Sequence, residues 1–234
     1  MPQPQWHGFA SPEHLAESLS REVADIVRER LDTIGSAFVA FPGGQSPRPT
    51  FEALASWATG WHEVTIIPTD DRLVPSGDPL SNYGMLARSF EGTWAQVVPL
   101  VRPPFDDPHA AAEAAELRLS ELAWPLDLVW LGFGLDGHVA SLLPGPDLAD
   151  ALASPEWRRI AGIVPAPLPP EAPAARVTLT LSAILSARRL LISGSGHDKL
   201  EVLKRALNEG EGSAMPLGIV LARARCQPDL FWSR

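Results

Sequence analysis

The spacing of hydrophobic residues predicts a chain of alternating helices and strands. Between residues 11 and 35 apolar side chains recur every three or four positions, which is the period of one helix face. Ser11 and Pro12 are typical of the start of a helix, and Gly35 is typical of its end. The sequence therefore predicts a helix over 11–35.

Short apolar runs between such segments predict strands. The run "LDLVWLGF" at 126–133 is apolar at nearly every position, which suits a strand covered on both faces. Further strands are expected at 36–41, 63–71 and 188–193, and further helices at 50–58, 81–90, 107–122 and 197–207. This alternation predicts an α/β fold: a parallel-rich, Rossmann-like sheet with helices on both faces and a ligand site at the C-terminal ends of its strands.

One proline-rich segment interrupts the alternation. Residues 165–173, "PAPLPPEAP", hold five prolines in nine positions and predict a stiff, extended surface connection. A linker between domains is an alternative, but the chain beyond it is too short for an independent domain, and no internal repeat is found. For 234 residues we expect a single α/β domain spanning 1–234.

Composition and charge narrow the classes of partner. The net charge of -9 argues against nucleic acid or an anionic membrane as the main partner. A small anionic substrate stays compatible with it, because local cations and helix N-termini bind phosphate. Cys226 is the only cysteine, so neither an intramolecular disulfide nor a cysteine-based metal site is expected. The N-terminus lacks the pattern of a signal peptide and no apolar run reaches the ~18 residues of a membrane span, so we expect a cytoplasmic protein.

The loop "PGGQSPRP" at 42–49, between a predicted strand and a helix, has the features of a phosphate site. Gly43 and Gly44 allow close approach of the backbone, Gln45 and Ser46 offer donors, and the following helix offers unpaired N–H groups. Glycine pairs after strands are also common as plain turns, so both interpretations stay open. The loop matches neither a Walker motif nor GxGxxG, and nucleotide binding is not indicated.

A charged turn follows the second predicted strand. Asp70 and Asp71 have no histidine or third carboxylate at ligand spacing nearby, so no metal site is expected. Arg72 is a candidate bidentate donor to a phosphate or carboxylate. For an isolated "DDR", the favoured interpretation is a solvated cluster in which Arg72 neutralises an aspartate.

Two further candidates come from later loops. In "GFGLDGHVASLLPG" at 132–145, His138 is of the residue type suited to general-base work near neutral pH, and Asp136 is placed to orient its ring. A hydrogen-bonded histidine in a tight loop explains the pattern equally well. Lys199 lies in the first turn of a predicted helix, where the dipole disfavours a cation unless an anion is bound. An ordinary solvated lysine is the alternative. No GxSxG nucleophile motif is found, so covalent acyl transfer is not indicated.

The order of these motifs resembles the 6-phosphogluconolactonase family, part of a superfamily that includes glucosamine-6-phosphate deaminase. The shared features are the glycine loop, an acid–acid–Arg turn followed by Ser-Asn-Tyr, a Gly-x-Gly-x-Asp-Gly-His loop and a late Gly-x-x-Lys helix. "LGFGLDGHVASLLPG" is similar to the family signature almost throughout, and "ARVTLTLSAILSARRLLI" resembles the segment after it. The resemblance covers residues 11–221.

The resemblance implies hydrolysis of 6-phospho-D-glucono-1,5-lactone, the second step of the oxidative pentose phosphate pathway, with no cofactor and no metal. The implied partner is thus a small phosphorylated sugar lactone. His138 matches the family's general base, which activates a water. The implied catalytic residues are His138, Asp136 and Arg72, and the implied binding residues are Gly43, Gly44, Gln45, Ser46, Asn82 and Lys199.

Several positions depart from the family's usual pattern. Asp71 replaces a glutamate, Pro42 and Gln45 change the glycine loop, and Val139 replaces a frequent threonine. The deaminase loop resembles Asp-Gly-His-x-Ala-Phe-Asn-Glu, and its glutamate position is Leu143 here. Because an aliphatic side chain cannot relay a proton, a sugar-phosphate deaminase or isomerase is disfavoured. A non-catalytic sugar-phosphate-binding module is a further alternative, disfavoured because the chain has no basic patch and no spare domain.

Overall fold

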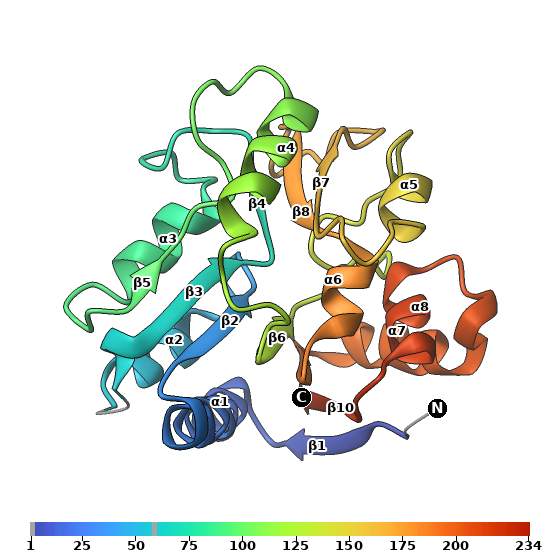
Figure 1. The fold of residues 1–234 in the computed structure, drawn as a ribbon. Helices are drawn as coiled ribbons and strands as arrows, with labels where there is room; N and C mark the ends of the chain where they lie inside the picture. The colour runs from blue at the N-terminus through green and yellow to red at the C-terminus, as the bar shows by residue number, and fades with distance from the viewer. Residues whose placement is uncertain (1–2, 58–59) are drawn as a thin grey trace.

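The predicted alternation folds around one parallel sheet. The computed structural model describes residues 3–57 and 60–234. Its first sheet contains β1 (Gln5–Phe9), β2 (Ala37–Phe41), β3 (Val64–Pro68), β5 (Gln96–Val97), β6 (Leu128–Leu131), β9 (Arg189–Ser195) and β10 (Pro228–Ser233). Among the described residues these seven strands run in the order β1-β10-β9-β6-β2-β3-β5, with every pairing parallel (Figure 1). The predicted parallel-rich sheet is confirmed.

Alternate side chains of the central strands enter two different cores. In β6, Leu128 and Trp130 join one core, while Val129 and Leu131 join the other. Helices on both faces supply the rest of each core. The first face carries α1 (Pro12–Ile34), α2 (Arg48–Ala55) and α3 (Asn82–Ser89); the second carries α6 (Leu181–Ser186), α7 (His197–Glu209) and α8 (Pro216–Arg223). Helix α4 (Pro108–Leu119) joins the second core but packs on β7 (Ile160–Ile163) and β8 (Arg176–Leu179). The uninterrupted apolar run of β6 therefore reflects burial on both sides of the sheet.

A second, smaller sheet is antiparallel and was not predicted. It contains β4 (Asp70–Arg72), β7 (Ile160–Ile163) and β8 (Arg176–Leu179), in the order β4-β8-β7. The strand predicted at 63–71 is therefore wrong as one element. At Thr69 the chain changes sheets: its N–H donates to Phe41 O at 2.9 Å, and its carbonyl accepts from Leu179 N at 2.9 Å.

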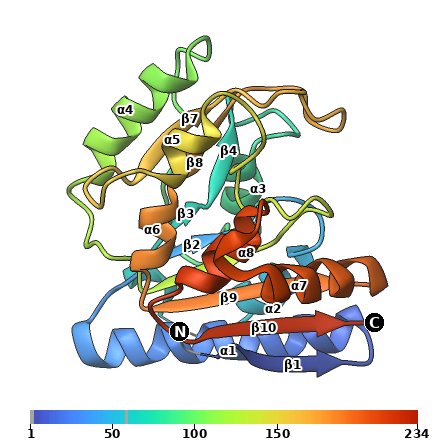
Figure 2. The same cartoon turned by 90° about the vertical axis from the view of Figure 1, so that its right-hand side faces the viewer.

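The proline-rich segment 165–173 connects β7 to β8, which are neighbours in the small sheet. It is a loop between two paired strands. The short helix α5 (Leu148–Leu152) precedes β7. In Figure 2 the small sheet, α4 and α5 lie above one face of the large sheet, and α1 lies below the other.

The helix boundaries follow the capping signals. Ser11 caps α1 by accepting from His14 N at 3.4 Å, and Gly35 ends it with φ of 84°. The helix predicted at 50–58 begins earlier, at Arg48, and ends at Ala55. Its predicted last residue, Ala58, lies outside the described residues.

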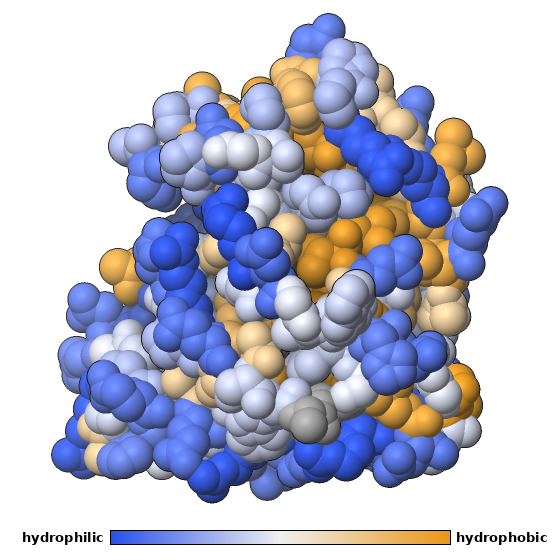
Figure 3. Space-filling view, turned by 90° about the vertical axis from the view of Figure 1, so that its left-hand side faces the viewer, coloured by the Kyte–Doolittle hydropathy of each residue, from blue (hydrophilic) through white to orange (hydrophobic). Residues whose placement is uncertain are grey.

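One edge of the large sheet, formed by β5, is short and mostly surrounded by polar surface. Strand β5 has only two residues, and the face over β5 and α3 is largely hydrophilic with a hydrophobic area at one side (Figure 3). A short edge strand offers little template for pairing with another chain. Within the described part of the chain, no helix is both long and apolar enough to cross a membrane.

Candidate active site

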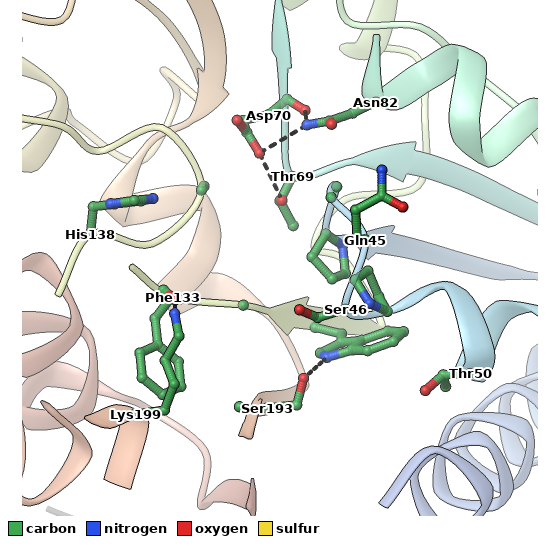
Figure 4. A pocket seen from close by; sticks show the side chains of 18 of the residues that line it. Gln45, Ser46, Thr50, Thr69, Asp70, Asn82, Phe133, His138, Ser193 and Lys199 are labelled. Atoms are coloured by element: carbon green, nitrogen blue, oxygen red, sulfur yellow. Dashed lines mark hydrogen bonds between the residues drawn. The ribbon is translucent and has the colours of Figure 1, made fainter. Parts of the chain in front are cut away.

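A cavity of about 260 Å³ lies where the C-terminal ends of the parallel strands meet the small sheet. Its walls come from the loops after β2, β3 and β6, from β4 and β8, and from the end of β9 with the first turn of α7 (Figure 4). The structure brings eight of the predicted site residues to its lining: Gly43, Gly44, Gln45, Ser46, Arg72, Asn82, His138 and Lys199. The ninth, Asp136, lies behind His138 and contacts its ring.

The loop after β6 holds His138 on a tight turn. Gly137 has φ of 82°, a conformation that favours glycine, and its N–H donates to Gly134 O at 3.1 Å. Gly134 N in turn donates to His138 O at 2.9 Å. A Cβ at Gly134 would lie 2.3 Å from the imidazole. The glycines of this motif therefore allow the ring to fold back over its own loop.

Asp136 fixes the orientation of the imidazole. Its Oδ1 lies 2.6 Å from Nδ1 of His138, and it also accepts from His138 N at 3.3 Å. Burial alone raises the pKa of the Asp136 carboxyl, but the adjacent His138 outweighs it, so the pKa lies below its usual value. An ionised carboxylate only accepts hydrogen bonds, so Nδ1 carries the proton. In the neutral form of the ring, Nε2 then carries the lone pair, and the ring lines the cavity.

The glycine loop approaches the other side of the cavity closely. A Cβ at Gly43 would lie 1.9 Å from Oδ1 of Asn82, so only glycine lets the loop pack against that side chain. Gly44 has φ of 92°. The carbonyl of Gln45 accepts from Arg48 N at 3.2 Å, which turns the chain into α2. Helix α2 has no side-chain cap, but few N–H groups of its first turn are available, because Arg48 N is bonded to Gln45 O and Pro49 has no N–H.

The two adjacent aspartates have different partners. Asp71 accepts from the backbone N–H groups of Asn82 at 2.7 Å and Tyr83 at 3.1 Å, and so holds the N-terminus of α3. Burial raises the pKa of Asp71 to about 6, against the opposing effect of these donors. Asp70 lines the cavity and accepts from Ser141 Oγ, a residue of the His138 loop. Among the described residues no group of three or more His, Cys, Asp or Glu is arranged for a metal.

Arg72 is not held in the predicted solvated cluster. Its Nη1 donates to Leu80 O at 2.8 Å and to Oδ1 of Asn82 at 3.1 Å. Nε is buried without a hydrogen-bond partner in the described structure. The guanidinium of Arg72 thus lines the cavity and donates its hydrogen bonds to neutral oxygens. Its positive charge can therefore interact with a ligand in the cavity.

Lys199 stands on the His138 side of the cavity, across from Gln45 and Thr50 in Figure 4. Its Nζ donates to Phe133 O and lies 4.7 Å from the centre of the Phe133 ring. Burial lowers the pKa of Lys199, and the nearby Asp136 counteracts this in part. The predicted phosphate contacts therefore come from two opposite walls: the glycine loop and α7.

Comparison with known proteins places the chain in a family. The family model of glucosamine-6-phosphate isomerases and 6-phosphogluconolactonase matches residues 10–232. The chain belongs to this family. Its relatives include the 6-phosphogluconolactonase of Mesorhizobium japonicum, 34% identical over 97% of this chain and 94% of that protein. The 6-phosphogluconolactonase of Pseudomonas putida is 34% identical over 97% of this chain and 91% of that protein.

Solved structures agree with this membership of the glucosamine-6-phosphate isomerase/6-phosphogluconolactonase family. A 6-phosphogluconolactonase from Shewanella baltica superimposes with a TM-score of 0.90 at 31% identity, covering 99% of this chain and 98% of that one. A monomeric glucosamine-6-phosphate deaminase superimposes with a TM-score of 0.78 at 20% identity, covering 98% of this chain and 97% of that one. The second likeness shows a shared fold alone.

The sequence did not identify Arg176 as a residue of this cavity. Arg176, on β8, lines the cavity directly opposite Arg72 in the β4–β8 pairing and is 5% exposed. Burial lowers the pKa of Arg176, and Asp70 counteracts this in part. The alternation of "RVTL" was a signal for a strand, with Val177 and Leu179 in the core. No pattern in the neighbouring sequence indicates that the other face of this strand lines the cavity.

Proposed function

We propose that this protein hydrolyses 6-phospho-D-glucono-1,5-lactone to 6-phospho-D-gluconate. Family membership and the 6-phosphogluconolactonase relatives at 34% identity support the reaction class. The observation that carries the mechanism is the contact of 2.6 Å between Asp136 and Nδ1 of His138, which leaves Nε2 as a base on the cavity wall.

Hydrolysis proceeds by attack of water on the lactone carbonyl. Nε2 of His138 takes a proton from the water as its oxygen bonds to C1, and the carbonyl oxygen becomes an oxyanion. Arg72 is the candidate donor to that oxyanion, because its guanidinium lines the cavity without a carboxylate partner in the described structure. Collapse of the intermediate breaks the bond from C1 to the ring oxygen. Imidazolium returns the proton to that leaving oxygen, and the product is a free acid.

The phosphate positions the carbonyl against this water. Backbone N–H groups around Gly43 and Gly44, the side chain of Ser46 and the charge of Lys199 form the proposed phosphate site. Binding at a remote group of the substrate orients the reacting atoms and raises the rate without further chemistry from the protein. We propose Gln45 and Asn82 as further contacts of the bound sugar.

The sugar-phosphate deaminase or isomerase is the main alternative for this fold. That chemistry needs a carboxylate to relay protons, and the position of the deaminase glutamate is Leu143. Leu143 is 5% exposed and thus packed in the interior. An aliphatic side chain at this position cannot relay a proton, which favours the lactonase. Independence from cofactors, a cytoplasmic location and the lack of nucleic-acid or membrane partners stay predictions from the sequence.

A direct assay tests the proposal. The purified protein is expected to hydrolyse freshly prepared 6-phosphogluconolactone faster than its spontaneous hydrolysis. It is expected to release no ammonia from glucosamine 6-phosphate. Wild-type hydrolysis no faster than background would falsify the proposed function, and ammonia release would favour the deaminase.

The role of His138 is tested by His138→Ala, which is expected to lower kcat by about 10²–10⁴-fold, because the water loses its base. His14→Ala, a change on the exposed start of α1, is the matched control and keeps wild-type activity. If His138→Ala retains full kcat while wild type is active, the reaction stands and the general-base assignment is overturned.

A further inference from the structure

The floor of the cavity holds a tryptophan–serine pair that the proposed mechanism does not use. Nε1 of Trp130 donates to Oγ of Ser193 at 2.8 Å, and both residues line the cavity. Trp130 comes from β6 and Ser193 from the neighbouring strand β9. The dashed line in Figure 4 marks this contact.

The indole is rigidly held, so its N–H points in a fixed direction. Trp130 is only 1% exposed. Its ring meets Phe41 and Phe51 edge-on, with centroid distances of 5.9 and 5.2 Å. Such aromatic contacts fix the ring plane. The position of the Ser193 oxygen is thereby set by a donor that cannot rotate.

This contact determines what Ser193 presents to a ligand. An indole nitrogen is a donor only, so Ser193 must accept in this pair and its own O–H proton must point elsewhere. Within the described part of the chain, the Ser193 hydroxyl has no acceptor at hydrogen-bond distance. Because the side chain lines the cavity, its proton is directed at whatever occupies the cavity floor.

The surroundings of Ser193 indicate the chemistry of that occupant. In Figure 4 Ser193 lies between Lys199 on one wall and Ser46 on the other, away from Asp70 and Asn82. The adjacent residue, Gly194, has no side chain, which leaves room for the Phe133 ring that Lys199 covers. A cation and several donors with no carboxylate among them match a group that only accepts hydrogen bonds, as the oxygens of a phosphate do.

We propose that Ser193 donates a hydrogen bond to the phosphate of the bound substrate, and that Trp130 is a positioning residue that orients this hydroxyl. This assignment rests on the proposed function, because it takes the cavity's ligand to be a phosphorylated lactone. Ser193 becomes a residue that selects phosphorylated over unphosphorylated lactones.

The test compares Ser193→Ala with wild type in three measurements: kcat and KM for 6-phosphogluconolactone, the Kd of the product 6-phosphogluconate, and the Ki of inorganic phosphate as a competitor. Loss of one hydrogen bond to a charged group is expected to raise KM, Kd and Ki by about tenfold to a hundredfold and to leave kcat within a few-fold. Ser120→Ala, an exposed change at the end of α4, is the control and alters none of these constants.

Trp130→Phe separates positioning from packing. It removes the N–H and keeps an aromatic ring, so it is expected to raise the same three constants by a smaller factor. In a Ser193→Ala background it is expected to have no further effect on ligand affinity, because the hydroxyl it orients is gone. A purely structural role of Trp130 would give the same loss in both backgrounds.

Three outcomes overturn the inference while wild-type lactonase activity stands. The first is a Ser193→Ala enzyme with unchanged KM, Kd and Ki. The second is a fall in kcat with unchanged product affinity, which would place Ser193 at the reacting carbonyl. The third is an equal loss on Trp130→Phe with and without Ser193. Absence of wild-type hydrolysis would instead refute the proposed function, and the phosphate and product affinities would still report on Ser193.

Discussion

At the scale of single residues, what the site can donate or accept depends on which of its polar atoms are already hydrogen-bonded within the protein. His138 has one ring nitrogen held by Asp136 at 2.6 Å, and Ser193 has its oxygen held by Trp130 at 2.8 Å. Asp136 can only accept a hydrogen bond, so His138 presents its other ring nitrogen to the cavity as an acceptor. Trp130 can only donate, so Ser193 presents its hydroxyl proton to the cavity. Preorganisation by such contacts removes the need to orient the groups when substrate binds.

Replacing Asp136 by asparagine tests the first of these pairs. An amide can turn its NH₂ group toward Nδ1, which favours the tautomer with the proton on Nε2, where no water proton can then be accepted. We expect kcat to fall by roughly 10²–10⁴-fold. KM is expected to change little, because Asp136 is not part of the cavity lining.

Steady-state kinetics of Asp136→Asn beside Leu135→Ala measures this effect. Leu135 is 58% exposed on the same loop, so its truncation is expected to leave kcat unchanged. An Asp136→Asn enzyme with kcat within a few-fold of wild type would show that the ring orients itself without the carboxylate.

At the scale of elements, local patterns predicted most of the large sheet and its helices. Strand β6 was predicted because its apolar run is continuous, and α1 because its cap, first proline and final glycine agree. Motif residues at loops, such as His138, were found because glycines and polar groups cluster after a buried strand. These signals lie within about ten residues of chain and need no knowledge of pairing.

The small sheet escaped prediction because its pairings are remote in the sequence. Strand β4 has three residues and pairs with β8, about a hundred positions later. A three-residue strand has too short an alternation to be distinguished from a loop. Arg176 and Ser193 reach the cavity only through such long-range pairing, so their chemistry could not be assigned from spacing.

Asp71 gives a pH-dependent prediction for the start of α3. Its pKa is raised from 3.8 to about 6 in the fold, chiefly by burial. Well below pH 3.8 the carboxyl is protonated in both states; between pH 3.8 and about 6 it is ionised in the unfolded chain and still protonated in the folded one. The free energy of unfolding contributed by this group therefore falls as pH rises through that window, by about 3 kcal/mol, and is constant above it.

Asp71→Asn removes this titration. The difference in unfolding free energy between wild type and Asp71→Asn is expected to decline from pH 4 to 6 and then level off, measured by urea denaturation at each pH. Asp32→Asn, an exposed change on α1, is the control and should run parallel to wild type. A difference that is flat from pH 4 to 7 would show that the donors around Asp71 offset its burial completely.

At the scale of the whole molecule, an acidic protein concentrates positive charge in one cavity. The net charge is -9, yet Arg72, Arg176 and Lys199 all line the site. Cations in a cavity with buried walls attract an anionic ligand more strongly than the same charges on the surface would. We therefore expect the overall charge to disfavour extended polyanions and the local charge to favour a small anion.

The two sheets share one hydrophobic core, which predicts that they unfold together. Val177 of β8 and Ile160 of β7 pack in the same cluster as Val129 and Leu190 of the large sheet. Because apolar residues of both sheets pack in one cluster, we propose that residues 1–234 act as one domain and expect a single cooperative transition. Far-UV circular dichroism and tryptophan fluorescence should then give coincident urea curves, and saturating 6-phosphogluconate should shift both midpoints equally. Two separated transitions, or a ligand shift confined to one probe, would show instead that the small sheet folds as a unit of its own.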